Sequence, residues 1–204
     1  MTRSFLPFAL IAAGLTMPAI ASAEPVIGQA APAFTLLDVN NKPVSLADFK
    51  GKTIILEWTN PGCPYVRAHY DSGNMQTTQA KALKDGAVWL TINSSAPGKQ
   101  GHMSAAEAKG QLARDESSPS HYLLDPKGSV GMFYAAKTTP QIYVITPEGK
   151  LAYNGAINDR PTADESDARA GTNYALAALS AVNTGKAANP AFTKPYGCAV
   201  KYPG

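Results

Sequence analysis

The sequence predicts one α/β domain, with a central mixed β-sheet flanked by helices and a β-hairpin added at its N-terminal side. An apolar run over residues 53–58, a helical pattern and a second apolar run over residues 88–92 follow one another. This strand–helix–strand order implies parallel pairing. Two later runs, residues 141–145 and 151–153, flank Pro147-Glu148-Gly149. They predict a hairpin that adds antiparallel strands to the same sheet.

A basic residue, an apolar run and a small-residue motif open the chain. Arg3 precedes the apolar residues 5–20, and Ala21-Ser22-Ala23 has small residues at both ends of an A-x-A cleavage site. This order is typical of a secretory signal peptide. The run is shorter than the ~20 residues that a membrane anchor needs. We therefore expect cleavage before Glu24, a periplasmic or secreted mature protein of residues 24–204, and no membrane span after cleavage.

The expected mature chain has nearly balanced charge and two cysteines. The full chain has 18 Lys and Arg against 15 Asp and Glu, and losing Arg3 leaves a net charge of +2. This balance gives no reason to expect a nucleic-acid partner. Cys63 and Cys198 are too few for a disulfide scaffold, but two cysteines in an exported chain suggest one disulfide.

The other elements follow from local signals. Asn40-Asn41 predicts a hairpin turn between strands over residues 34–37 and 44–46. The remaining expected elements are a helix from Pro64 to about Leu83 that loosens near Ser72-Gly73, a helix from the Ser104/Glu107 capping box to about Arg114, a strand over 122–124, a short helix over 130–134 and a helix over 173–182. We expect a polar loop at residues 164–167 and an irregular tail over 186–204.

Cys63 stands between the strand over 53–58 and the helix that begins at Pro64, after the turn Asn60-Pro61-Gly62. The thiolate is the reactive form of cysteine, and a free thiol has a pKa of about 8.5. Unpaired N–H groups and the dipole at a helix start stabilise an anion. Arg67, about one turn further on, adds positive charge. A lone cysteine is more often an inert one that fills core space. The strand–turn–helix setting, the expected export and the pattern described next together favour the reactive thiolate here.

Four segments in chain order resemble a known family. Residues 58–67, Trp-Thr-Asn-Pro-Gly-Cys-Pro-Tyr-Val-Arg, resemble the active-site turn of thioredoxin-like redoxins. The closer match is a peroxiredoxin-like subgroup, related to alkyl hydroperoxide reductase and thiol-specific antioxidant proteins, with a Cys-Pro-[Phe/Tyr]-Val turn. Residues 138–145 resemble the thioredoxin cis-proline strand, and residues 153–161 the next strand and its exit loop. Residues 196–202 resemble the Gly-Cys-x-[Ile/Val]-Lys ending of the subgroup.

The resemblance covers almost the whole of residues 24–204 and implies a thioredoxin-like fold with Cys63 as the nucleophile. It implies that the bond before Pro140 is cis and lies against the reactive cysteine, and that Thr139 presents a backbone edge to the substrate chain. Cys198 is the candidate resolving cysteine. We expect as further substrate-binding or supporting residues Trp58, Asn60, Pro64, Arg67 and Arg160. Core packing is the alternative for Trp58, and a solvated side chain is the alternative for Arg160.

Three positions differ from the patterns of related families. Val66 replaces the second cysteine of the thioredoxin Cys-x-x-Cys motif, so Cys63 has no neighbouring thiol. Asn60 stands where peroxiredoxins carry Thr or Ser, and Leu56 where they carry proline. A permanent structural disulfide is the alternative to a redox-active pair between Cys63 and Cys198, and a separate unpaired role for each thiol is the third possibility. Such a bond would close nearly the whole domain, worth on the order of 5 kcal/mol in the chain-entropy model.

These observations leave three functions open. The first is an exported thiol–disulfide oxidoreductase, and the second is a thiol-dependent peroxidase. The third is a non-catalytic binding or chaperone-like module held by a structural disulfide. The first two require a protein or small-molecule disulfide or a peroxide as substrate, and an external thiol as reductant. We expect no cofactor and no metal, because the histidines are scattered and no phosphate loop is present.

Overall fold

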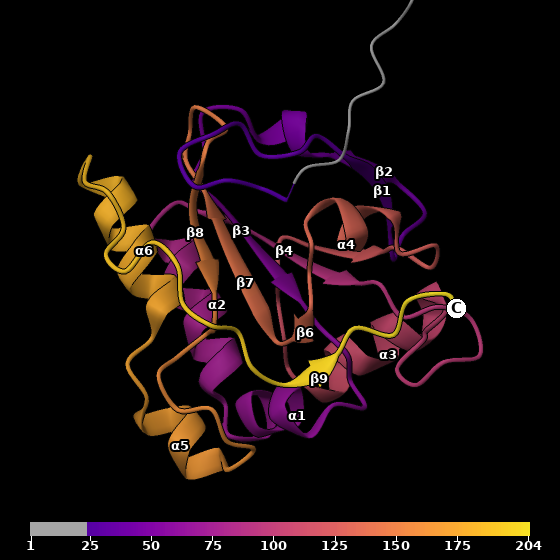
Figure 1. Cartoon of the computed structure of the whole chain (residues 1–204). Helices are drawn as coiled ribbons and strands as arrows, with labels where there is room; N and C mark the ends of the chain where they lie inside the picture. The colour runs from indigo at the N-terminus through magenta and orange to yellow at the C-terminus, as the bar shows by residue number, and fades with distance from the viewer. Residues whose placement is uncertain (1–23) are drawn as a thin grey trace, which may run out of the picture.

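The computed structural model describes residues 24–204, and the expected signal peptide lies outside the described residues. In this part of the chain seven strands form one sheet in the order β2-β1-β5-β4-β3-β7-β8 (Figure 1). Their bounds are β1 Thr35–Asp38, β2 Pro43–Ser45, β3 Ile54–Trp58, β4 Val88–Asn93, β5 His121–Leu124, β7 Gln141–Ile145 and β8 Leu151–Gly155. Strands β3, β4 and β5 pair in parallel, whereas β7 pairs antiparallel with both β3 and β8. The predicted mixed sheet and both hairpins are confirmed.

Helices cover the two faces of this sheet, and the N-terminal hairpin β1–β2 forms one end of its strand order. The helices are η1 Leu46–Phe49, α1 Pro64–Asp71, α2 Asn74–Lys84, α3 Ala105–Arg114, α4 Ser129–Phe133, α5 Glu165–Ala170 and α6 Tyr174–Asn183. Alternate residues of β3 supply two separate cores. Ile55 packs with α1, α2 and α6, and Leu56 packs with the hairpin and α4. No helix of residues 24–204 has the length and apolar character to cross a membrane.

Local sequence signals account for the starts of several helices. The helical conformation is interrupted between α1 and α2 at Gly73, whose φ of +76° favours glycine. This is the predicted loosening near Ser72-Gly73. The predicted capping box forms at α3, where the Ser104 side chain accepts from the Glu107 N–H and the Glu107 carboxylate accepts from the Ser104 N–H.

Two local predictions were wrong. Residues 164–167 were expected as a polar loop, but Glu165 begins helix α5, and the Asp164 side chain caps it by accepting from the Ser166 N–H at 2.7 Å. Leu46 was expected in a strand, but it begins the short helix η1, which Ser45 and Asp48 cap. In both cases a capping residue that suits a helix start was interpreted as part of another element.

The C-terminal tail is less irregular than expected. Strand β9 (Cys198–Ala199) pairs antiparallel with strand β6 (Thr138–Thr139), and together they form a second, two-stranded sheet. The tail thus returns from the end of α6 to the segment just before Pro140. This pairing places both ends of the sequence pattern, the early cysteine turn and the late Gly-Cys motif, at one edge of the molecule (Figure 1).

Candidate active site

Cys63 is the residue just before helix α1, and its side chain is completely buried. Its Sγ donates a hydrogen bond to the main-chain carbonyl oxygen of Thr139 at 3.1 Å. The Cys63 side chain makes no capping bond to the first turn of the helix. Strand β3 ends at Trp58, and the four residues 59–62 lead from that strand to the cysteine at the helix start.

The segment opposite Cys63 is the one that the sequence identified. The bond between Thr139 and Pro140 is cis. Thr139 lies directly opposite Cys198 in the β6–β9 pair, and Cys198 packs against the core cluster that contains Cys63. The structure therefore brings together Cys63, Thr139, Pro140 and Cys198, which are separated by up to 135 positions in the sequence.

The two thiols differ in their surroundings. Cys63 is fully buried, whereas Cys198 is partly exposed, and neither takes part in a disulfide in this structure. Partial burial raises the pKa of the Cys198 thiol to about 11, and the neighbouring Cys63 thiol acts in the same direction. Lys201 opposes this rise. Cys198 therefore keeps its proton at neutral pH.

Two of the expected supporting residues shape the turn itself, and a third lies in the core beside it. Pro64 is the first residue of α1, where its missing N–H costs nothing. The Asn60 side chain closes the turn: its Oδ1 accepts from the Gly62 N–H at 2.8 Å, and its Nδ2 donates to the Gln100 carbonyl at 3.2 Å. Trp58 is fully buried in the core on the hairpin side, where its Nε1 donates to Ser94 Oγ at 3.1 Å.

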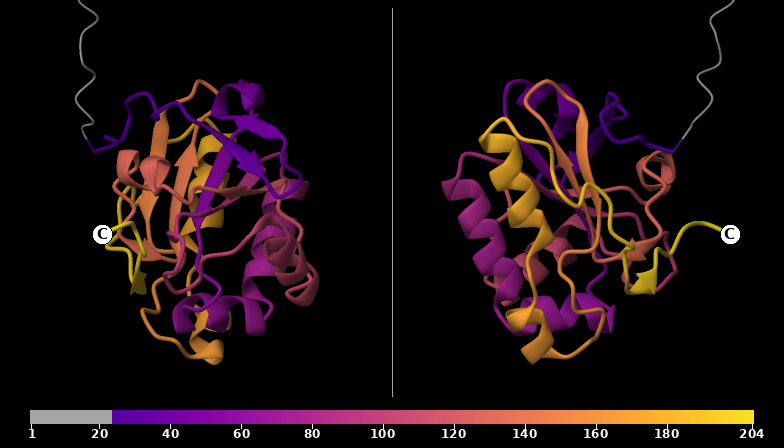
Figure 2. Two further views of the ribbon diagram at one scale, coloured as in Figure 1. Left: turned by 90° about the vertical axis from the view of Figure 1, so that its right-hand side faces the viewer. Right: turned by 60° about the vertical axis from the view of Figure 1, so that its left-hand side comes forward.

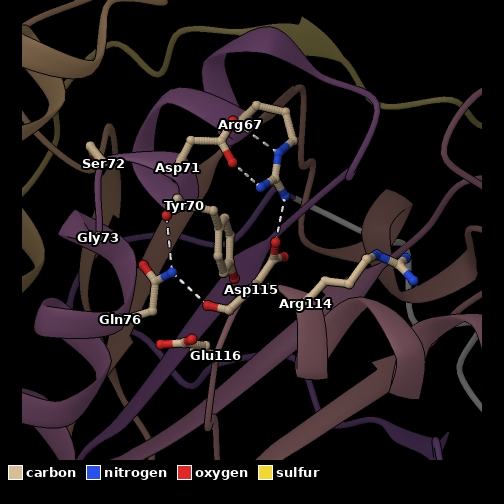
Figure 3. A pocket seen from close by; sticks show the side chains of 9 residues that line it. All are labelled: Arg67, Tyr70, Asp71, Ser72, Gly73, Gln76, Arg114, Asp115 and Glu116. Atoms are coloured by element: carbon tan, nitrogen blue, oxygen red, sulfur yellow. Dashed lines mark hydrogen bonds and ion pairs between the residues drawn. The ribbon is translucent and has the colours of Figure 1, made fainter.

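The two expected arginines are held by carboxylates. The Arg67 guanidinium lies between Asp71 and Asp115, in a polar pocket between the end of α1 and the end of α3 (Figure 3). Arg160 pairs with Asp159 and Asp167. Within residues 24–204 neither guanidinium has a hydrogen bond to the cysteine pair. Cys63 itself stands at the start of α1, which is the positive end of the helix dipole.

Sequence analysis missed a buried carboxylate in β3. Glu57 is fully buried, and its Oε2 accepts from Trp89 Nε1 at 2.9 Å and from Thr91 Oγ1 at 3.0 Å. Its Oε1 accepts from the Tyr70 hydroxyl at 2.8 Å. Burial raises the pKa of Glu57, and these hydrogen bonds lower it in part. The one available signal was a charged residue inside an otherwise apolar run.

Sequence analysis also missed a contact between α1 and the tail. His69 Nε2 lies 3.0 Å from the Tyr196 hydroxyl, and His69 Nδ1 lies 2.7 Å from Asn74 Nδ2. Because an amide nitrogen donates, Nδ1 accepts, and the neutral ring carries its proton on Nε2. The Tyr196 hydroxyl in turn donates to Asn158 Oδ1. Burial lowers the pKa of His69 to about 4, so the ring is neutral at physiological pH.

No group of three or more His, Cys, Asp or Glu side chains in residues 24–204 is placed to hold a metal ion. The chemistry that the site offers is that of its two thiols.

The fold and this site define a thioredoxin-like domain, in which a cysteine at a helix start faces a cis-proline segment. The Redoxin family model matches residues 27–171. The chain belongs to the Redoxin family, a family of thioredoxin-like thiol oxidoreductases. A Haemophilus influenzae protein that is named as the peroxiredoxin bcp is 38% identical to this chain over 85 residues. That match covers 36% of this chain and 46% of the relative, so the chain spans less than half of the relative's length.

Solved structures show the same fold. A conserved protein of Geobacillus kaustophilus has a TM-score of 0.75 at 25% identity, over 93% of this chain and 98% of that one. A hypothetical protein of Sinorhizobium meliloti 1021 has a TM-score of 0.73 at 22% identity, over 89% and 97% of the two chains. The thioredoxin domain of a thiol-disulfide oxidoreductase from Bacteroides vulgatus has a TM-score of 0.51 at 25% identity, over 63% and 87%.

Glu57 should make stability fall as pH rises. A carboxyl group whose pKa is raised in the folded state adds stability below its unfolded pKa, and this contribution is lost as pH rises through the folded pKa. Glu57→Gln removes the titration and keeps an amide of similar shape. The melting temperature of the variant relative to the natural protein should therefore increase between about pH 4 and pH 8. A difference that stays constant, or that moves the other way, would contradict the assignment.

His69 should make stability fall at acid pH. A base whose pKa is lowered in the folded state contributes stability above its unfolded pKa, and this is lost as pH falls toward about 4. The loss should be on the order of 3 kcal/mol, because each pKa unit corresponds to about 1.4 kcal/mol. Urea unfolding between about pH 4 and pH 7 should show a flatter profile for His69→Gln than for the natural protein. Parallel profiles would show that His69 does not titrate in this way.

Proposed function

We propose that this redoxin is an exported thiol–disulfide oxidoreductase that works through a reversible Cys63–Cys198 disulfide. One observation carries the proposal: the two thiols meet at the Thr139–Pro140 segment, and one of them lies at a helix start. Cys63 stands directly before α1, and the free N–H groups and dipole of a first helical turn stabilise negative charge. The signal-peptide pattern of residues 1–23 supports export to a periplasmic or extracellular space, where disulfides persist.

The proposed reaction has two exchange steps. The Cys63 thiolate attacks one sulfur of a substrate disulfide, and the other substrate sulfur leaves as a thiolate with the electron pair. Cys198 then loses its proton and attacks the Cys63 sulfur of the mixed disulfide, which releases the second substrate sulfur. The protein is left with a Cys63–Cys198 disulfide and the substrate with two thiols, a transfer of two electrons. An external dithiol reverses the oxidation of the protein.

Because the pKa of Cys198 is raised, the two thiols have different roles in the proposed reaction. A protonated thiol is a poor nucleophile, so Cys198 does not compete with Cys63 for the first attack. Its position beside Cys63 then allows it to resolve the mixed disulfide without a second cysteine in the helix turn, where the chain has Val66. Cys198 thus takes the resolving role of the missing neighbouring thiol.

Peroxide reduction is the second candidate, which the likeness to the Haemophilus influenzae protein favours. The Cys63 thiolate would attack a peroxide oxygen and form a sulfenic acid as the O–O bond breaks. Condensation of the sulfenic acid with the Cys198 thiol would release water and give the same disulfide. Asn60 weighs against efficient peroxide activation, because both ends of its amide are already used to hold the turn.

Trapping experiments separate the proposed function from its alternatives. The reduced mature protein is treated with oxidised glutathione or with stoichiometric peroxide, and the products are mapped by mass spectrometry. We expect oxidised glutathione to give the Cys63–Cys198 disulfide in the natural protein and a glutathione adduct on Cys63 in Cys198→Ser. Cys63→Ser is the matched control and should give neither product.

Two other results would contradict the proposal. Sulfenic acid on Cys63 in Cys198→Ser, together with slow reaction with glutathione disulfide, would favour the peroxidase. Inert thiols in both assays would leave a binding module in which the pair is structural.

A further inference from the structure

The C-terminal segment from Tyr196 to Tyr202, here called the strap, crosses the site and is held at both ends. Before it, the Asn154 N–H donates to the Ala191 carbonyl at 3.1 Å on the edge of β8. Beyond β9, the Lys201 carbonyl accepts from the Ala96 N–H at 2.8 Å, and the Tyr202 hydroxyl donates to the Ala136 carbonyl at 2.7 Å. Figure 2 shows this yellow segment running along one side of the molecule to the C-terminus.

The strap occupies the free edge of β6. Thr138 pairs with Ala199, and Thr139 pairs with Cys198, in an antiparallel register. Without these partners, a two-residue strand beside the reactive sulfur would present unpaired N–H and C=O groups. Such an edge accepts an extended polypeptide by β-strand addition, in which main-chain hydrogen bonds give affinity and side-chain fit gives specificity.

The strap also closes access to Cys63. Tyr196 and Cys198 pack against the core that contains Cys63, and the rings of Tyr65 and Tyr196 lie with their centroids 5.9 Å apart. Cys63 has no exposed surface, whereas Cys198 within the strap is partly exposed. A sulfur that is fully buried cannot meet the sulfur of another protein until the strap has moved.

Gly197 determines how closely the strap approaches. Its φ is +124°, a conformation that side chains rarely adopt, and a Cβ built there would overlap the Thr139 carbonyl oxygen. Thr139 is the residue whose carbonyl also accepts the Cys63 thiol. A strand lying at this edge in the same register must therefore have glycine directly before its cysteine.

We propose that the strap is a resident, displaceable strand in a docking site for extended polypeptides, and that the site selects a cysteine preceded by glycine. The proposal rests on the thiol chemistry proposed above and names its substrate class, a protein segment that replaces residues 197–199 along β6. In the free protein the strap keeps Cys63 closed. An incoming chain reaches the cysteine by exchanging its own main-chain hydrogen bonds for those of the strap.

The test opens the strap without touching Cys63. All variants carry Cys198→Ser, so that Cys63 is the only thiol. Gly197→Ala forces β9 away from β6, and the control Gly149→Ala changes a glycine that also has a positive φ, +80°, but has open space around it. Circular dichroism and thermal melting verify that the fold persists. Tyr202→Phe, which removes the hydrogen bond to Ala136 at the far end, is a milder opening variant.

The probe is a synthetic peptide with the sequence of residues 194–201, whose cysteine is activated as a disulfide with thionitrobenzoate. The Cys63 thiolate attacks the peptide sulfur, and thionitrobenzoate leaves with the electron pair and is measured by absorbance. The rate constant should rise at least about tenfold in Gly197→Ala over both the parent and Gly149→Ala, and less in Tyr202→Phe, because the open form becomes more populated. In the opened variant, a peptide with alanine in place of its glycine should react several-fold more slowly.

The outcomes distinguish this proposal from the proposed function. Fast and equal reaction in the parent, Gly197→Ala and Gly149→Ala would show that the strap does not control access. Equal rates for the glycine and alanine peptides would refute the selectivity. A Cys63 that remains unreactive in every variant would overturn both the docking site and the proposed thiol chemistry.

Discussion

The hydrogen bond from the Cys63 thiol to the Thr139 carbonyl is the contact on which the site depends. It joins two segments that no local sequence signal connects, the helix start after β3 and the short strand before Pro140. The antiparallel pairing of β3 with β7 makes this hydrogen bond possible. Trp58, the last residue of β3, lies opposite Gln141, the first residue of β7, so the turn that carries Cys63 and the segment before Pro140 lie at the same end of these strands. The strap completes the arrangement by pairing with β6.

Burial and reactivity oppose each other at this site. A thiol with no exposed surface is protected from indiscriminate oxidation, which attacks accessible thiolates first. The same burial excludes a protein substrate. A displaceable strap allows both protection of Cys63 and access of a substrate, because the main-chain hydrogen bonds of a short strand can be exchanged for equivalent ones. Cys198, which is protonated and partly exposed, is carried by the element that would have to move.

The sequence predicted the sheet, most helices and the cysteine at a strand–helix junction, because apolar runs and capping residues are local signals. It did not predict the β6–β9 pair, since two-residue strands have no periodicity and their pairing depends on a distant segment. Arg67 was expected to add positive charge near Cys63, but its guanidinium forms an ion pair with Asp115, which directly follows α3. The role of Glu57 could not be predicted locally, because its donors come from α1, α2 and β4, among them Tyr70, Gln79 and Trp89.

The central claim is that the Cys63–Cys198 disulfide is a working redox couple and not a permanent staple. Its reduction potential tests this claim most directly, through equilibration of the mature protein with glutathione or dithiothreitol buffers and quantification of both forms by mass spectrometry. The account predicts a potential well above about −300 mV, within the range of catalytic disulfides. A potential below about −300 mV, where structural disulfides lie, would contradict it.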